Sequence, residues 1–346
     1  MTRRANLFRC FTWLCWGVIV VLWGAAALVK WVGPQWLITS PLAFVPKLLP
    51  GLAFLVPMAM GLLTNRRRMM GVAIFSIVLW FGPALEWRLP GRQKTAEGPV
   101  LRIMTCNRGQ NHGHSVKPWI DRVRPDVIAF QDAWSPDAYL AGSPDYADYP
   151  HRKRVGEHVL LSRYPITFAT QASRGPILRK GSQWHYQPAG RFGIDFHGRE
   201  IIVWSVHLRS PRNHFRQLRG ALAWTVGWSR KDGIPASGAT GDLENYWAEH
   251  RRSIEALNEL FRSEQSPTVI AGDWNVPDVG PDYQAMTVSL TDAHREVGRG
   301  YGSTFPGDLK WWPAFHQPWL RIDYVLSDCH WRPVRCVVEP DSEGAQ

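Results

Sequence analysis

Two side chains able to bind phosphate or a metal ion stand two positions apart at the end of an apolar run. The run is residues 268–271, and the tetrapeptide Gly272-Asp273-Trp274-Asn275 follows it. In an extended chain, alternation puts Asp273 and Asn275 on the same face, where they can hold a hydrated phosphate or metal ion. Turns also use glycine, aspartate and asparagine, so the tetrapeptide alone leaves both a site and a plain turn open.

Four further segments carry a polar side chain within or at the end of an apolar, β-type run. The four residues and their segments are Asn107 (101–107), Asp132 (125–132), His207 (201–208) and Asp323 (321–326). Each side chain can bind phosphate or metal. Plainer interpretations also exist, because Asn107 can cap a strand, Asp132 can cap a helix and His207 can be a buried structural histidine.

In this order, the five segments resemble the endonuclease/exonuclease/phosphatase superfamily, which includes deoxyribonucleases, abasic-site endonucleases, sphingomyelinases and inositol-polyphosphate phosphatases. The resemblance covers residues 100 to about 340 and includes an ancillary segment at 156–165. It implies an α/β fold, a four-layer α/β/β/α sandwich of two mixed sheets. It also implies metal-dependent hydrolysis of a phosphodiester or pyrophosphate.

The resemblance assigns a role to each residue. Asn107 and Asp132 would hold the metal, although the family usually has glutamate where Asp132 stands. Asp273 would orient or deprotonate the attacking water, while His207 would donate to a phosphoryl oxygen and Asn275 would hydrogen-bond the phosphate. A site with few carboxylates suits Mg²⁺, which keeps several waters, and Mn²⁺ is the alternative.

The last family motif is incomplete in this chain. The family reads Ser-Asp-His there, and its histidine pairs with the residue at Asp323, whereas residues 342–344 are Ser-Glu-Gly. Glu343 would replace the acid that helps to bind metal, but no residue replaces the histidine. We therefore expect either a truncated or frame-shifted end or an impaired domain. Three other histidines offer a substitute ring: His294, His316 and His330.

Residues 1–87 predict a membrane anchor, joined by a polar linker at 88–99 to the catalytic domain at 100–346. Three apolar stretches, at about 10–33, 38–64 and 69–86, are predicted to be transmembrane helices. A cleaved secretory signal is the alternative for the first stretch. Its apolar core is too long for a signal, and two more apolar segments follow it.

Arginines indicate the orientation of the anchor. Arg3, Arg4 and Arg9 precede the first stretch, and residues 66–68, all arginine, separate the second from the third. By the positive-inside rule these segments are cytoplasmic. Three spans then predict a multi-pass protein of the cytoplasmic (plasma) membrane with an extracytoplasmic domain.

The net charge argues against a strong nucleic-acid binder. Residues 1–86 contribute +7 of the total of +11, so only about +4 remains for the catalytic region. We therefore expect a phosphoesterase that acts on a lipid-linked phosphate of the cell envelope, with the lipid bilayer as its partner and no protein partner evident. The alternatives are a nuclease acting on external DNA and a phosphate-binding pseudoenzyme.

Overall fold

The computed structural model describes residues 2–36, 38–45, 48–82, 87–88, 95–109, 115–133, 143–172, 188–215, 236–305 and 318–338. The metal ligand predicted at Glu343 lies outside these residues. So do His316 and half of the linker predicted at 88–99, residues 89–94.

Two mixed β-sheets form the body of the molecule. The first has the order β1 (Ile103–Asn107), β2 (Val127–Gln131), β4 (His158–Ser162), β3 (His151–Val155). The second has the order β5 (Ile166–Gln171), β6 (Ala189–Phe196), β7 (Arg199–His207), β8 (Thr268–Asp273), β10 (Asp323–Ser327), β9 (Thr291–Asp292). The pairs β1–β2 and β7–β8 are parallel, and the other pairs are antiparallel.

Strand β2 is apolar without interruption because both of its faces are buried. Val127 and Ala129 pack into the core between the sheets, where they meet Phe192 and Ala271 of the second sheet. The alternate residues of β2 point the other way and pack with Ile120 of α6 (Lys117–Val123), so both faces of the strand are buried. Strand β2 therefore lies between a helical layer and the second sheet.

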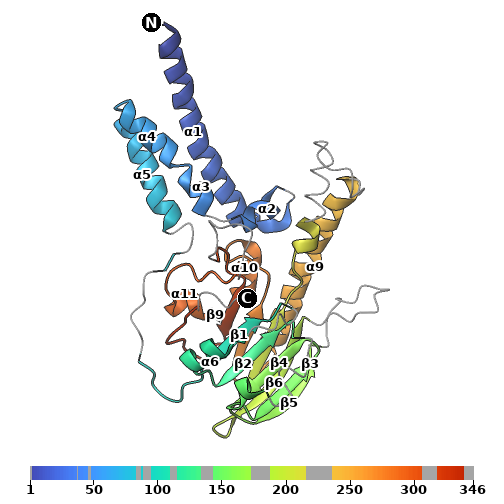
Figure 1. Cartoon of the computed structure of the whole chain (residues 1–346). Helices are drawn as coiled ribbons and strands as arrows, with labels where there is room; N and C mark the ends of the chain where they lie inside the picture. Colours follow the sequence, from blue (N-terminus) through green and yellow to red (C-terminus); the bar gives the residue numbers. More distant parts are fainter. Residues whose placement is uncertain are drawn as a thin grey trace.

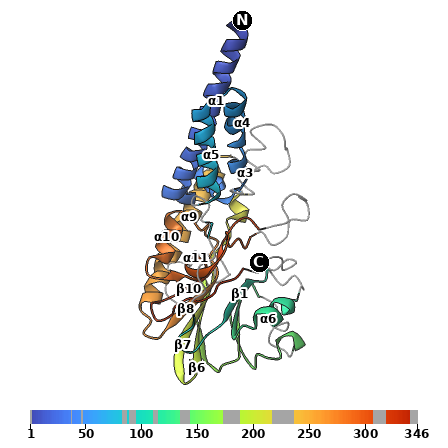
Figure 2. The same cartoon turned by 90° about the vertical axis from the view of Figure 1, so that its left-hand side faces the viewer.

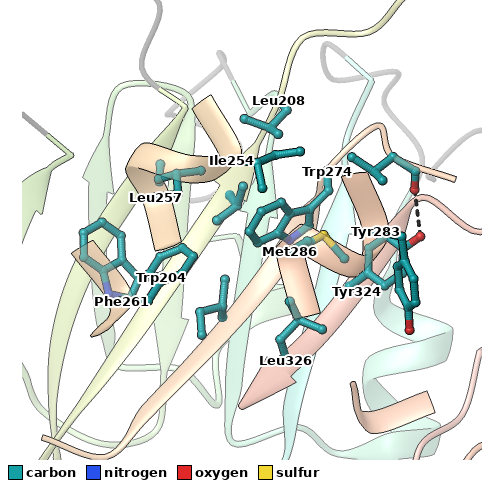
Figure 3. Close-up of a cluster of buried hydrophobic side chains, with 14 of the residues drawn as sticks. Trp204, Leu208, Ile254, Leu257, Phe261, Trp274, Tyr283, Met286, Tyr324 and Leu326 are labelled. Atoms are coloured by element: carbon teal, nitrogen blue, oxygen red, sulfur yellow. Dashed lines mark hydrogen bonds between the residues drawn. The ribbon is translucent and has the colours of Figure 1, made fainter. Parts of the chain in front are cut away.

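Helices cover the outer face of the second sheet. The long helix α9 (Ala236–Arg262) brings Ile254, Leu257 and Phe261 together with Trp204 of β7, at the spacing of one helix face (Figure 3). Helix α10 (Pro281–Thr287) joins the same cluster, and α11 (Ala293–Val297) follows it. Two mixed sheets with helices on both outer faces confirm the predicted α/β sandwich.

One helix in the described part of the chain is long and apolar enough to cross a membrane. This is α1 (Thr2–Trp31), of which Phe8–Trp31 is the apolar part. An apolar helix near the N-terminus is also typical of a signal sequence. The prediction of three spanning helices is wrong for the residues that the structure describes.

Prolines explain why the second apolar stretch is not a single span. It divides into α2 (Thr39–Phe44), α3 (Leu48–Leu52) and α4 (Leu55–Leu63), and each of these has proline as its third residue. Proline lacks the N–H that a helix interior needs but fits the first turn, so each proline favours a new helix start.

The third stretch forms α5 (Arg67–Phe81), whose 15 residues are too few to span a bilayer alone. At about 1.5 Å per residue it is roughly 22 Å long, against about 30 Å of hydrocarbon core. Helices α4 and α5 pack beside α1 through Ile19, Phe54 and Trp80. Both views show the three helices projecting from one end of the sandwich (Figures 1 and 2).

Candidate active site

The predicted site residues of the second sheet are neighbours in the strand register. His207 at the end of β7 lies opposite Asp273 at the end of β8, and Asp273 lies opposite Asp323 at the start of β10. Parallel pairing of β7 with β8 and antiparallel pairing of β8 with β10 bring these two strand ends and one strand start to the same edge.

Gly272 is required by a close approach between strands. Its φ is +156°, and a Cβ there would collide with the Val206 carbonyl oxygen and lie 2.7 Å from the Val206 nitrogen. A side chain does not fit between the two backbones. Glycine at this position therefore lets β8 deliver Asp273 beside His207.

Asn275 reaches the site by a turn and not by strand alternation. Strand β8 ends at Asp273, whose Oδ1 accepts from the Asn275 backbone nitrogen at 2.8 Å, and Asn275 has a left-handed φ of 51°. Its Nδ2 donates to the Leu208 carbonyl oxygen at 2.8 Å. The extended geometry expected for the pair is thus wrong, although the two residues remain in contact.

Asn107 joins the first sheet to the second at this edge. Its Nδ2 donates to Asp273 Oδ2 at 2.8 Å and lies 3.4 Å from His207 Nε2, while its Oδ1 accepts from the Gly109 nitrogen at 2.8 Å. Beneath it, Gln131 Nε2 donates to Ser205 Oγ at 2.9 Å across the two sheets. These contacts fix how the polar ends of the two sheets face each other.

A buried glutamate holds the histidine. Glu157, in the turn between β3 and β4, has its Oε1 2.9 Å from His207 Nδ1. Burial alone would lower the pKa of His207, but the Glu157 hydrogen bond and the charges of Asp273, Glu157 and Asp132 outweigh it and raise this pKa to about 9. His207 is therefore a cation at neutral pH, and its Nε2 carries a proton 4.0 Å from Asp273 Oδ2. Because Asn107 Nδ2 is also a donor, its 3.4 Å approach to that nitrogen is a contact and not a hydrogen bond.

Burial raises the pKa of both buried aspartates, and the charge of His207 opposes the rise in each. Burial raises the pKa of Asp273, while His207 and the hydrogen bonds from Asn107 and Asn275 oppose that rise. Burial and the charge of Asp273 raise the pKa of Asp323 well above its usual value. Neither carboxylate oxygen of Asp323 has a hydrogen-bond partner among the described residues.

None of the three candidate histidines is seen to pair with Asp323. His294 lies near the Arg299 carbonyl oxygen, with its Nε2 at 3.3 Å, and His330 bonds to Asp328. His316 lies outside the described residues. The histidine that most affects Asp323 electrostatically is His207, whose charge lowers the pKa of the aspartate.

Asp132 lies beside the same cluster. It follows the end of β2 in a left-handed conformation (φ 51°), and its charge acts on both His207 and Asp273. No three His, Cys, Asp or Glu side chains converge as a ready metal-ligand set among the residues described. A hydrated ion needs fewer protein ligands, and an Asn107 oxygen, the Asp132 carboxylate and the unpartnered Asp323 suit a hard, oxygen-liganded cation.

The structure brings together all the predicted site residues that it describes, and it adds one. The added residue is Glu157, which lies in the ancillary family segment but had no role predicted from the sequence. In the sequence it is an acid between Gly156 and the apolar run of β4, which assigns no role by itself. The structure places it in a tight turn, where Gly156 has a φ of 59°. An acid in that tight turn is 8% exposed, so it needs a partner.

Residues 106–345 match the model of the Endonuclease/Exonuclease/phosphatase family, which is more than half of the chain. The protein therefore belongs to this family. Members of the family are hydrolases that act on phosphoesters. No curated protein matches the chain in sequence.

Solved structures of this fold superpose on the chain at low sequence identity. Sphingomyelinase C from Streptomyces griseocarneus is 17% identical, with a TM-score of 0.42, over 69% of this chain and 86% of that one. A β-hairpin deletion mutant of beta toxin from Staphylococcus aureus is 15% identical, with a TM-score of 0.45, over 70% and 94%. Humanized D. rerio TDP2 is 14% identical, with a TM-score of 0.44, over 67% and 86%.

Proposed function

We propose that the protein is a membrane-anchored, divalent-metal-dependent phosphoesterase that hydrolyses a phosphodiester or pyrophosphate, with a lipid-linked phosphate of the cell envelope as substrate. The observation that carries the proposal is the contact of Asn107 with both Asp273 and His207, at 2.8 and 3.4 Å. The Asn107 amide of the first sheet thus lies beside the Asp273 carboxylate and the His207 imidazolium of the second. Phosphoryl transfer needs such a set of donors and a base.

His207 and Asp273 divide the proton chemistry in this proposal. His207, protonated because Glu157 holds its Nδ1, donates from Nε2 to a phosphoryl or leaving-group oxygen. Asp273 orients the attacking water and accepts its proton. Asn107 holds the Asp273 carboxylate in place, and the second N–H of Asn275 is available to the phosphate.

Asn107 and Asp132 would hold the metal ion, with water completing its coordination. Mg²⁺ is favoured over Mn²⁺ because the protein supplies few, hard oxygen ligands. When bound, the ion would neutralise charge on the phosphate oxygens. Asp323, which lies opposite Asp273 in the strand register, would offer a further carboxyl oxygen near the ion, while the part predicted for Glu343 remains a prediction.

The membrane part of the proposal rests on α1 and on the arginines in its N-terminal turns. A single span with Arg3, Arg4 and Arg9 on the cytoplasmic side leaves the C-terminal domain outside, as three spans would. The apolar surface of α1, including Trp13 and Leu14, is exposed in the isolated chain and would lie in lipid. The domain would then meet phosphates on the extracytoplasmic face of the cytoplasmic membrane.

Substrate preference tests the proposal against its alternatives. Purified full-length protein with Mg²⁺ should release phosphate from a polyprenyl pyrophosphate faster than it nicks plasmid DNA. The reverse ranking would favour the nuclease. Inertness toward both substrates, with phosphate binding retained, would favour the pseudoenzyme.

A further inference from the structure

Segments that adjoin the site strands connect the site to the anchor, and the first of them follows β8. After Asn275, the chain reaches Gly280 and α10, and a Cβ on Gly280 would lie 3.1 Å from the Val29 carbonyl oxygen of α1. A Cβ on Gly33 would likewise lie 2.8 Å from the Pro281 ring. Five residues span at most about 17 Å, so Asn275 lies within that distance of the contact.

A second connection runs from the end of β7. His207 is followed by Leu208 and Arg209, and the Arg209 carbonyl oxygen accepts from the Tyr246 hydroxyl. The adjacent Trp247 donates from Nε1 to Ser40 Oγ of α2 at 2.9 Å, and its ring lies 6.0 Å from that of Phe44. Helix α2 therefore packs against α9, which in turn contacts the segment that follows His207.

A third connection precedes β10. Trp319, four residues before Asp323, donates from Nε1 to the Phe44 carbonyl oxygen at 3.3 Å. Segments adjoining β8 and β10 thus contact the end of α1 or the short helix after it, and the segment after β7 reaches that helix through α9. Figures 1 and 2 show α2 and α10 at the end of the sandwich from which α1 projects, with the β5–β6 end farthest away.

The chain between α1 and α2, called the anchor junction below, exposes aromatic and aliphatic side chains. Trp31 at the end of α1 is 74% exposed, Trp36 57% and Ile38 70%, and the exposed apolar face of α1 continues from them. Tryptophan at the end of an apolar helix is typical of the membrane–water interface. If α1 spans the bilayer, residues 31–38 lie at the headgroup level.

We infer that the active-site edge faces the membrane surface, so that the enzyme acts on phosphate headgroups of lipids in its own bilayer. The inference rests on the proposed function and adds the route of the substrate, which reaches the site from the bilayer that holds the anchor. A lipid headgroup in the same leaflet needs no desorption to reach Asp273 and His207. A phosphate on a second membrane or in bulk water has to approach past the anchor junction.

Reconstituted full-length protein tests this geometry. With one phosphodiester lipid as the probe, the rate should follow its mole fraction in the enzyme's own vesicles. The same amount of lipid in separate vesicles should react at least about tenfold more slowly, because tethering sets a high local concentration. Equal rates from the two vesicle populations would overturn the inference.

Two charge substitutions provide a matched comparison. Trp36→Glu places a charge at the proposed interface, and we expect at least about a tenfold loss of lipid hydrolysis with bis(p-nitrophenyl) phosphate hydrolysis in solution unchanged. Val288→Glu is the control, since Val288 is 67% exposed at the opposite end of α10 from Pro281. Equal losses in both variants would contradict the inference.

The soluble substrate separates the two possible failures. If bis(p-nitrophenyl) phosphate is hydrolysed with Mg²⁺ but the two vesicle populations react equally, the phosphoesterase proposal stands and the membrane-facing geometry is wrong. If neither the lipid nor the soluble diester is hydrolysed, both the proposed function and this inference fail.

Discussion

His207 combines burial with a positive charge, and Glu157 is the main reason that it can. A buried imidazole without an acidic partner loses its proton. His250 is an example, because burial lowers its pKa to about 4 although a backbone hydrogen bond with Trp274 opposes the shift. His207 has Glu157 at 2.9 Å and aspartates nearby, and its pKa rises to about 9 instead. The two histidines show that the partner, more than the burial, decides the charge.

The Glu157→Gln variant tests this assignment through the pH profile of kcat/KM. In the wild type, activity that needs protonated His207 should fall as the pH rises through about 9. Without the Glu157 charge the pKa of His207 falls, so this alkaline limb should move to lower pH by about one unit or more. Asp121→Asn, on the exposed α6 pair with Lys117, is the control. An unmoved limb in Glu157→Gln would refute the pairing.

At the scale of elements, the approach of β8 to β7 is the most constrained feature of the site. Gly272→Ala should destabilise the domain by on the order of 3 kcal/mol, because the new methyl meets the Val206 backbone at a positive φ. Chemical unfolding in detergent measures the change. Gly71→Ala is the control, since no atom lies within 4 Å of its added Cβ. Equal stabilities for the two variants would contradict the account.

Strand ends were predictable from the sequence because each apolar run stops at its polar residue. Asn107, His207 and Asp273 are the last residues of β1, β7 and β8. Their mutual contacts were predictable only through the family resemblance, since pairing between two sheets leaves no local signal. Glu157 escaped for the same reason: its partner His207 is 50 residues away.

The anchor shows where composition alone was insufficient. Apolar composition predicted three spans, but it ignores where helices restart, and the prolines of α2, α3 and α4 restart them. The conformation of Asn275 escaped similarly, because strand alternation does not foresee an immediate turn after Asp273. Local backbone chemistry overrode the periodic pattern in both places.

At the scale of the whole molecule, the orientation of α1 decides which phosphates the site can meet. With three arginines in the N-terminal turns of α1, we expect residues after Trp31 to lie outside the cytoplasmic membrane. Alkaline phosphatase fused after Gln346 should be active, and a fluorescent protein fused there should not fluoresce. Moving the arginines to follow Trp31 should weaken this orientation. Fluorescence without phosphatase activity in the native sequence would reverse the assignment.

The central claim is that Asp273, held by Asn107 beside protonated His207, performs metal-dependent phosphoester hydrolysis. Asp273→Asn keeps the shape of this buried side chain and removes its charge. The most direct measurement is bis(p-nitrophenyl) phosphate hydrolysis by the purified full-length protein, with Mg²⁺ and with EDTA. We predict hydrolysis with Mg²⁺, its loss in EDTA, and a fall of at least about 10²-fold in Asp273→Asn, measured on variant protein that circular dichroism shows to be folded. Equal Mg²⁺-dependent rates for wild type and Asp273→Asn would contradict the account.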